Sequence, residues 1–302
     1  MGKSTKTRTE LNIDGERVAI TNIEKLLWSQ KTIKKYDYLK FLTVIAPYML
    51  PFLKDRLLTV IRFPNGIEQE SFYQKNCPDY APSYIETKLV DGIKYIVCSR
   101  LASLIWLGNQ SAVEFHIPFQ TINNKNPSEI VLDLDPPSQT EFPLAVEASL
   151  ILKEIFDKLH LHAFIKTSGN KGLQIYIPLN EQFSYSETRI FTSFIANYLV
   201  TKYPKSFTIE RLKKNRNKRL YVDFLQHAEG KTIIAPFSLR GNEQALMATP
   251  VFWSEVNEGL HPSQFPMEEG IARINKGILP FNDYFKVKKK QPFRKVLEII
   301  KQ

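Results

Sequence analysis

The stretch EIVLDLDPPS, residues 129–138, decides how the rest of the sequence is interpreted. A run of strand-forming residues ends in two aspartates one residue apart, and two prolines, which cannot donate to a sheet ladder, then stop it. Side chains alternate along a strand, so Asp133 and Asp135 would share one face, roughly 6–7 Å apart at Cα. This pattern fits an ordinary strand end. Because two carboxylates on one face repel, it also fits a site that shares a divalent cation or a proton.

Segments with strand and helix patterns alternate around this stretch. Helices are predicted at residues 36–53, 142–159 and 185–202. Strands are predicted at 57–63, 111–117, 129–135, 162–167, 172–178, 219–225 and 231–236, with a hairpin at 84–98 whose Asp91-Gly92 suits a primed turn. This order predicts an α/β protein (α+β, mixed sheet), with an N-terminal subdomain packed on the central sheet.

Composition narrows the class of protein. The 302 residues contain 41 Lys and Arg against 31 Asp and Glu, giving a net charge of +10, which favours a polyanionic partner such as nucleic acid. The two cysteines form no CxxC pair, which argues against a disulfide framework or a zinc site. The first twelve residues lack the apolar core of a signal peptide, and no apolar run of about 18 residues exists to span a membrane. A cytoplasmic protein is expected.

Two further motifs bear on phosphate chemistry. The loop in KTSGNKGL, residues 166–173, offers backbone N–H groups, a hydroxyl and an ammonium to a phosphate, although a plain hairpin turn fits equally well. Asp223 interrupts the apolar strand RLYVDFL, either as a salt-bridge partner or as a third carboxylate beside Asp133 and Asp135. Three carboxylates on adjacent strands can hold two divalent ions, as in-line phosphoryl or nucleotidyl transfer requires.

Other polar and aromatic side chains add weaker signals. Arg240 stands at a glycine turn and suits a phosphate, whereas His116 is either a site residue or a hydrogen-bonded sheet histidine. Residues 211–219 hold six basic residues in nine, so this segment is a solvated loop or one that faces nucleic acid. Phe72 and Tyr73, expected on a loop, are either a core plug or a platform for base stacking.

The motifs together carry a resemblance. In order, the chain contains RFPNG, FYQKN, EFH, VLDLDPP, KTSGNKGL, VDFLQ and TIIAPFSLRG, between about residues 21 and 253. This set resembles the polymerase domain of bacterial ligase D, a member of the archaeo-eukaryotic primase superfamily that serves non-homologous end joining. The resemblance implies one primase-polymerase catalytic domain over 1–302, with an N-terminal subdomain (about 1–110), a catalytic core (about 111–255) and a C-terminal helical extension (256–302).

The activity that the resemblance implies is metal-dependent, template-directed extension or filling of DNA ends and gaps. The substrates would be NTPs or dNTPs, often with a preference for ribonucleotides, and two divalent cations (Mn²⁺ or Mg²⁺) would serve as cofactors. The implied partners are DNA with 3′ overhangs or gaps and a downstream 5′-phosphate, the ligase domain or protein, and Ku. The implied location is the bacterial cytoplasm, at the nucleoid and away from membranes.

The resemblance also implies roles for individual residues. The metal ligands, which are also the catalytic residues, would be Asp133, Asp135 and Asp223. The incoming nucleotide would meet His116, Ser168, Lys171, Gln226 and Arg240, together with Gln174, which replaces the histidine usual in this family. DNA would meet Asn22, Lys25 and Lys35 at a downstream 5′-phosphate, Phe72 and Tyr73 at template bases, and Arg216 at template or nucleotide. Asp223 and Gln226 are three residues apart, so their strand must end or bulge between them if both serve one site.

Three alternatives remain open from the sequence. A primase that starts chains de novo would share the same motifs. A non-catalytic DNA-end-binding module of the same fold would be expected to lose a metal carboxylate, and all three are present. A nuclease could also use three carboxylates and a basic surface, but hydrolysis does not need the Ser168, Lys171 and Arg240 set.

Overall fold

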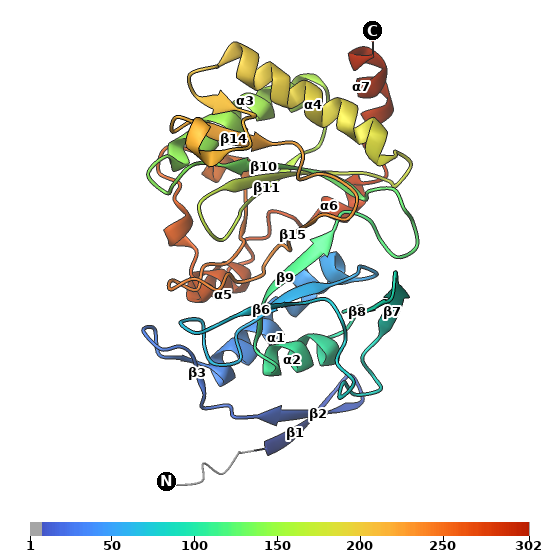
Figure 1. Ribbon diagram of the computed structural model, residues 1–302, viewed down its shortest axis with the longest axis vertical. Helices are drawn as coiled ribbons and strands as arrows, with labels where there is room; N and C mark the ends of the chain where they lie inside the picture. The colour runs from blue at the N-terminus through green and yellow to red at the C-terminus, as the bar shows by residue number, and fades with distance from the viewer. Residues whose placement is uncertain (1–7, 302) are drawn as a thin grey trace. The chain divides into compact units, whose positions relative to one another are not determined.

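The computed structural model describes residues 8–301 of the chain (Figure 1). Residues 1–7, which belong to the N-terminal stretch without a signal-peptide core, and residue 302 lie outside the described range. The chain forms two compact units. The first contains the chain up to Ile117 with the segments Ile234–Met247 and Pro266–Gly277, and the second contains Pro118–Ile233, Ala248–Phe265 and the segment from Ile278 onward. The assignment of residues 1–302 to a single catalytic domain stays a prediction.

The first unit is built on a four-stranded sheet in the order β15-β9-β5-β6, of which β15 contributes only Ile234 to this unit. Two helices, α1 and α2, pack on each other. Three two-stranded sheets, β1-β2, β3-β4 and β7-β8, complete its strands. The elements are β1 (Arg8–Ile13), β2 (Glu16–Thr21), β3 (Leu26–Trp28), β4 (Ile33–Lys34), α1 (Lys35–Leu53), β5 (Thr59–Arg62), β6 (Phe72–Gln74), β7 (Thr87–Val90), β8 (Ile93–Ile96), α2 (Leu101–Asn109), β9 (Ala112–Pro118), β15 (Thr232–Ile234) and α5 (Met267–Asn275).

The second unit is built on a six-stranded sheet in the order β13-β14-β10-β12-β11-β16. The β13-β14 pair is parallel and the others are antiparallel, so the predicted mixed sheet is confirmed. The elements are β10 (Glu129–Asp135), α3 (Phe142–Lys158), β11 (Phe164–Thr167), β12 (Leu173–Pro178), α4 (Tyr185–Lys202), β13 (Phe207–Thr208), the 3-10 helix η1 (Lys213–Asn215), β14 (Leu220–Asp223), β16 (Pro250–Val251), η2 (Trp253–Glu255), η3 (Pro262–Gln264), α6 (Tyr284–Val287) and α7 (Phe293–Ile300).

One face of the six-stranded sheet is the apolar face that the alternation in β10 predicts. Ile130, Leu132 and Leu134 are all at most 1% exposed and belong to one hydrophobic cluster with side chains of α3 and α4, such as Phe156 and Phe191. Both helices lie along this side of the sheet in Figure 1. Burial of a side chain of this size contributes about 1.5–3 kcal/mol, so the helices fix which way β10 faces.

The opposite face divides into an aromatic part and a polar part. The ring of Tyr176, on β12, lies 5.9 Å from the ring of Phe281 and 6.3 Å from that of Tyr284, so the C-terminal segment covers this part. Two residues before Tyr176 on the same strand, and therefore on the same face, lies the polar residue Gln174, where the candidate site begins. The predicted C-terminal helical extension therefore includes a structural cover for the site's own sheet.

The strongest sequence predictions are confirmed. Strand 129–135 and helix 185–202 match β10 and α4 at both ends. The predicted hairpin at 84–98 forms as β7 and β8, and Asp91 and Gly92 have φ of 50° and 78°, as a primed turn requires.

Other predictions were wrong or incomplete. Phe72 and Tyr73 were expected on a loop, but they lie on β6, which pairs with β5. Helix α2 and strands β1 to β4 had no prediction, because these segments are short or lack a clear apolar period. Within residues 8–301, no helix combines the length and the apolar character needed to cross a membrane.

Candidate functional site

Three carboxylates meet on the polar face of the second unit's sheet. Asp133 and Asp135 are alternate residues of β10 and therefore point to the same side. Asp223 is the last residue of β14, and the antiparallel register places it directly opposite Asp133. The predicted grouping of three aspartates on adjacent strands is thus present in the register of the sheet.

The row of side chains that face one another across the sheet, Asp223 and Asp133, continues across two more strands. Gln174 of β12 is directly opposite Asp133, and Lys166 of β11 is directly opposite Gln174. The Gln174 amide donates to Asp133 Oδ1 at 3.0 Å, whereas its Oε1 is buried without a hydrogen-bond partner among residues 8–301. Lys166 is fully buried, so a basic side chain lies inside the same sheet as the three carboxylates.

The surroundings of Asp133 disfavour its ionised form. Burial, together with the nearby carboxylates Asp135 and Asp223, raises the pKa of Asp133 to about 6, although the hydrogen bond from Gln174 opposes the change. A carboxylate in such a position releases its proton most readily when a cation arrives. This electrostatic arrangement is typical of a functional site.

Strand β14 ends at Asp223, so the strand ends between Asp223 and Gln226, as their three-residue spacing requires if both serve one site. The next residues form a turn, in which the Gln226 N–H donates to Asp223 Oδ1 at 3.0 Å. The Gln226 side chain donates to the carbonyl of Thr232 at 2.7 Å. Tyr221 Oη donates to the same Asp223 oxygen at 3.1 Å, so the carboxylate is held by two donors.

The loop between β11 and β12 is compact. Ser168 Oγ accepts from the N–H groups of Asn170 at 3.2 Å and Gly172 at 3.0 Å. A Cβ at Gly172 would lie 2.4 Å from the carbonyl oxygen of Leu134, so only glycine fits beside β10. Two of the N–H groups that the sequence offered to a phosphate therefore bind Ser168 instead, so the predicted phosphate contacts of this loop rest on the Ser168 hydroxyl and the Lys171 ammonium.

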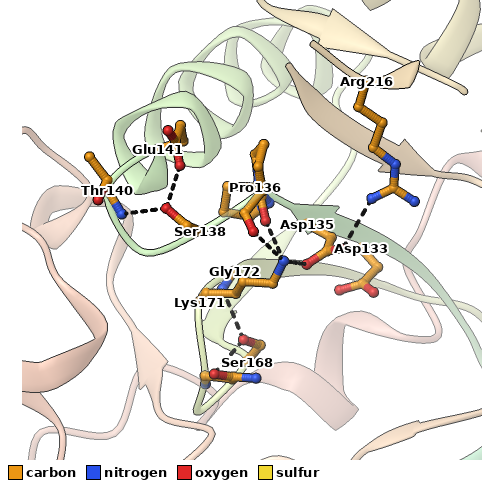
Figure 2. A network of polar contacts seen from close by, with 12 residues as sticks. Asp133, Asp135, Pro136, Ser138, Thr140, Glu141, Ser168, Lys171, Gly172 and Arg216 are labelled. Carbon is orange, nitrogen blue, oxygen red and sulfur yellow. Dashed lines mark hydrogen bonds and ion pairs between the residues drawn. The ribbon is translucent and has the colours of Figure 1, made fainter. Parts of the chain in front are cut away.

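Lys171 brings this loop to Asp135 (Figure 2). Its Nζ lies 3.0 Å from Asp135 Oδ1 and donates to the carbonyls of Pro136 at 2.6 Å and Pro137 at 3.0 Å. An ammonium has three hydrogens, so these contacts satisfy it. The predicted phosphate-binding lysine and the predicted metal-binding aspartate are thus direct neighbours.

Arg216 reaches the same carboxylate from the basic segment 211–219. Its Nη1 lies 3.5 Å from Asp135 Oδ2, and its guanidinium stacks 4.0 Å from the ring centre of Tyr221. It also donates to the carbonyls of Glu210 and Arg211, both at 3.0 Å. Arg216 is only 7% exposed, and its predicted contact with template or nucleotide stays a prediction.

The carboxylates have the chemistry of a divalent-cation site but do not form a closed one. Asp, Glu and backbone oxygens are the ligands that Mg²⁺ and Mn²⁺ prefer. Within residues 8–301, however, no group of three His, Cys, Asp or Glu side chains is arranged to hold a metal ion. Asp133, Asp135 and Asp223 each bind a neighbouring donor instead.

A second polar cluster lies in the first unit and includes two predicted nucleotide-binding residues. Glu114 of β9 is 7% exposed, and its carboxylate accepts from His116 Nε2 at 2.9 Å, Arg240 Nη1 at 2.9 Å and the Gly241 N–H at 3.0 Å. Burial alone would raise the pKa of Glu114, but the bond from His116 and the charge of Arg240 hold this pKa below its usual value. Glu114 therefore gathers His116 and Arg240, two side chains predicted to meet the nucleotide, into one cluster.

The aromatic pair on β6 is exposed. Phe72 and Tyr73 are 43% and 73% exposed, which excludes a core plug and leaves them available for stacking. The Arg62 guanidinium lies 5.2 Å from the Phe72 ring and donates to Gln74 at 2.8 Å and to Tyr80 at 3.1 Å. Arg62 thus holds β6 and presents a third exposed aromatic, Tyr80, beside the pair.

The predicted 5′-phosphate residues lie near one another in the first unit. Lys25 N–H donates to the Asn22 carbonyl at 3.0 Å, and Lys35 N–H donates to the Lys25 carbonyl at 2.7 Å. Lys35 is almost fully buried, and its ammonium donates to the carbonyls of Thr21 and Asn109, both at 2.9 Å. Burial and the positive charge of Lys25 lower the pKa of Lys35 to about 8. The Lys25 ammonium itself donates to the carbonyl of Pro64. Because the charge of Lys25 disfavours the charged form of Lys35, an anionic ligand near both would relieve this repulsion.

Sequence reasoning missed Glu114, Lys166 and Tyr221. Glu114 could have been predicted, since it is two residues before His116 on a strand and must lie on the same face of the sheet. Tyr221 bears the same relation to Asp223. Lys166 could not be placed, because its position opposite Gln174 depends on the register between β11 and β12.

Comparison with known proteins identifies relatives of this chain. The family model "LigD, primase-polymerase domain" matches residues 34–281. The chain is 45% identical over 287 residues to the bifunctional non-homologous end joining protein LigD of Bacillus subtilis, covering 95% of this chain and 47% of that protein. It is 31% identical over 248 residues to the multifunctional LigD of Mycolicibacterium smegmatis, covering 80% of this chain and 32% of that protein.

A solved structure is similar over most of the fold. The polymerase domain of Mycobacterium tuberculosis ligase D, in complex with DNA, matches with a TM-score of 0.83 and 26% sequence identity. The match covers 91% of this chain and 99% of that domain. The chain therefore accounts for the whole of that polymerase domain, while it spans about half or less of the curated relatives that it matches.

Proposed function

The chain belongs to the LigD primase-polymerase domain family, and from this premise we propose that it is a metal-dependent, template-directed nucleotidyltransferase. Its substrates are NTPs and dNTPs, and it extends or fills DNA ends and gaps in non-homologous end joining. Its DNA partner carries a 3′ overhang or a gap with a downstream 5′-phosphate. A ligase domain or protein and Ku are the further partners that this pathway implies.

The observation that carries the proposal is the register of the sheet. Asp133 is directly opposite Asp223, and Asp135 shares their face. These three residues would hold two divalent cations, which lower the pKa of an attacking 3′-hydroxyl and neutralise charge on the α-phosphate. A plain salt-bridge role would not need carboxylates from two neighbouring strands on one face.

The residues around the carboxylates have the chemistry to position a nucleotide. Ser168 and Lys171, on the loop beside β10, offer a hydroxyl and an ammonium to the triphosphate. Gln226 follows Asp223 in the turn and orients the nucleotide near that carboxylate. In the first unit, His116 and Arg240 form the pair on Glu114 that suits phosphate oxygens.

DNA binding is assigned to aromatic and basic residues of the first unit. Phe72 and Tyr73 stack on template bases, for which their exposure suits them. Lys25 and Lys35, with Asn22, attract the terminal 5′-phosphate, which carries more charge than an internal phosphodiester. The net charge of +10 supports attachment to the DNA backbone in general.

The experiment is primer extension on a gapped duplex with a downstream 5′-phosphate, in Mn²⁺ or Mg²⁺ and with NTPs or dNTPs. We expect templated addition that stops in EDTA, with ribonucleotides used better than deoxynucleotides. Omitting the primer tests de novo priming on the same template. The absence of templated addition by folded protein in every combination of metal and nucleotide would overturn the proposal.

A further inference from the structure

Both oxygens of the Asp135 carboxylate have positively charged neighbours (Figure 2). Lys171 Nζ lies 3.0 Å from Oδ1, and Arg216 Nη1 lies 3.5 Å from Oδ2. A divalent cation on this carboxylate would therefore have to share it with an ammonium and a guanidinium. Like charges on one ligand repel strongly in a partly buried site, so the proposed cation and these side chains compete.

The two neighbours differ in how firmly they are held. The Arg216 side chain is 9% exposed, and its stacking on Tyr221 and its bonds to the Glu210 and Arg211 carbonyls fix it without any help from Asp135. Lys171 is 23% exposed and belongs to a loop with glycines at 169 and 172. Its other acceptors are the carbonyls of Pro136 and Pro137. Lys171 is thus the neighbour that can leave.

We propose that Lys171 is an exchangeable counter-ion of Asp135 that couples cation binding to triphosphate binding. When the carboxylate takes up a cation, the Lys171 ammonium leaves Asp135 and binds the triphosphate of the incoming nucleotide. Arg216 keeps its place and continues to orient Asp135. This inference rests on the proposed function, because it takes Asp135 as a metal ligand and Lys171 as a phosphate ligand.

Exchange of this kind makes the two binding events favour each other. Without triphosphate, Lys171 competes with the cation; with triphosphate, the same ammonium is attracted to a new anion and the competition falls. Coupling between two ligands is reciprocal, so the cation must tighten triphosphate binding by the same factor. Typical coupling between two sites is about 5- to 150-fold in affinity.

The test measures Mn²⁺ binding by the electron paramagnetic resonance signal of free Mn²⁺, with and without a non-hydrolysable ATP analogue. The Mn²⁺ that the analogue binds without protein is measured separately and subtracted. In the wild type, we expect the analogue to tighten Mn²⁺ binding at least about five-fold. Lys171→Gln removes the competing charge, so Mn²⁺ alone should bind more tightly than in the wild type. The analogue should bind more weakly to this variant, and the coupling should fall to less than about half of the wild-type factor, the remainder coming from direct attraction between cation and phosphate.

Two variants show whether charge at this position is the cause. Lys171→Arg keeps a cation beside Asp135 and should keep the wild-type affinity for Mn²⁺ alone. Lys158→Gln removes one positive charge from an exposed position at the end of α3 and should behave as the wild type in every measurement. Far-ultraviolet circular dichroism checks that each variant is folded.

The outcomes separate this inference from the proposed function. If Lys171→Gln leaves Mn²⁺ affinity unchanged or weakens it while the coupling persists, Lys171 is not the exchanging group. If the wild type binds no Mn²⁺, or if Asp135→Asn leaves its Mn²⁺ affinity unchanged, then the metal site itself is wrong and the proposed function fails with it.

Discussion

Asp133 and Asp223 lie directly opposite each other on neighbouring antiparallel strands, where like charges destabilise a sheet. The pKa of Asp133 is raised to about 6 first by burial, and then by the charges of Asp135 and Asp223. Ionisation of Asp133 in the folded state therefore costs free energy. Such a cost is common at functional sites, where stability is lower than the fold alone would allow.

Asp133→Asn should stabilise the protein and abolish extension. The amide removes the repulsion and can still accept from Gln174, so we expect a gain of about 1–3 kcal/mol at pH 7.5 without divalent cations. The gain should be complete above the folded pKa of about 6 and vanish as pH falls below the unfolded pKa of 3.8. Thermal unfolding at several pH values measures it.

Asp135→Asn is the matched control, because its effect on stability should have the opposite sign. It leaves Lys171 and Arg216 without their shared carboxylate. Both variants should lose extension while the Kd for gapped DNA stays the same or falls, since removing negative charge does not weaken attachment to a polyanion. Equal stability losses in the two variants would show that repulsion at Asp133 is not significant.

How far the sequence predicts this site can be judged residue by residue. The two faces of β10 follow from alternation alone, so Asp133 and Asp135 were placed correctly on one side. To predict that Asp223 lies opposite Asp133, one must know the order of strands in the sheet, in which β10 lies between β12 and β14. No periodicity in the chain encodes this order. The resemblance supplied what local patterns could not.

The contacts of each side chain were beyond the sequence for another reason. Lys171 and Arg216 were assigned to nucleotide or template, and the structure shows them on Asp135. Such pairings depend on three-dimensional distances between residues 36 and 81 positions apart in the chain. Residue type predicted that these groups bind anions, but it could not say which anion they contact.

Glu114→Gln should weaken triphosphate binding and lower stability. A carboxylate accepts from His116, Arg240 and Gly241, whereas the amide NH₂ cannot accept, so at least one buried donor loses its partner. We expect a loss of about 1–3 kcal/mol in unfolding free energy. The Kd of a non-hydrolysable ATP analogue should rise by about ten-fold, corresponding to about 1.4 kcal/mol.

A matched control separates the cluster from a general loss of charge. Glu86→Gln makes the same chemical change at an exposed position of the same unit and should alter neither quantity. The ¹⁵N shifts of His116 add a direct readout, because a carboxylate partner requires hydrogen on Nε2, whereas the amide in the Glu114→Gln variant would permit the other tautomer. Wild-type analogue affinity in that variant would remove Glu114 from the positioning of the phosphate-binding pair.

His227 should make the second unit sensitive to acid. Its ring is fully buried, its Nε2 is 3.0 Å from Thr188 Oγ1, and burial lowers its pKa to about 3. Between the folded pKa of about 3 and the unfolded value of 6.5, the unfolded chain binds the extra proton, so acidification favours unfolding. From pH 7 to pH 5 this contributes a loss of about 2 kcal/mol.

His227→Gln removes this titration. The difference in unfolding free energy between the wild type and this variant should therefore shrink by about 2 kcal/mol when pH is lowered from 7 to 5. Urea unfolding at both pH values gives the two free energies. The same substitution at exposed His162 is the control for the loss of an imidazole. If the free-energy difference between the wild type and His227→Gln were the same at both pH values, the buried imidazole would not set the acid sensitivity.

The last prediction concerns the 5′-phosphate and uses the pKa of Lys35. Two ammonium groups near each other should give a phosphorylated gap at least about ten-fold tighter binding than an unphosphorylated one, since charge-assisted bonds contribute roughly 1.5–3 kcal/mol. The pKa of Lys35 is about 8 because of burial and the charge of Lys25. Lys35 loses its charge as pH rises through that value, so the preference should shrink between about pH 7 and pH 9.5.

Lys35→Met should show the reduced preference at both pH values, and Lys25→Met should reduce it at pH 7. Lys34→Met is the control, because Lys34 is adjacent in sequence but exposed and paired with Glu24. The measurement is Kd for gapped duplexes with and without the downstream 5′-phosphate. Wild-type values within a factor of two at pH 7 would exclude a phosphate pocket at Lys25 and Lys35, and would favour general gap filling over end joining. A preference that persists unchanged at the higher pH would instead assign the pocket to Lys25 without a charged Lys35.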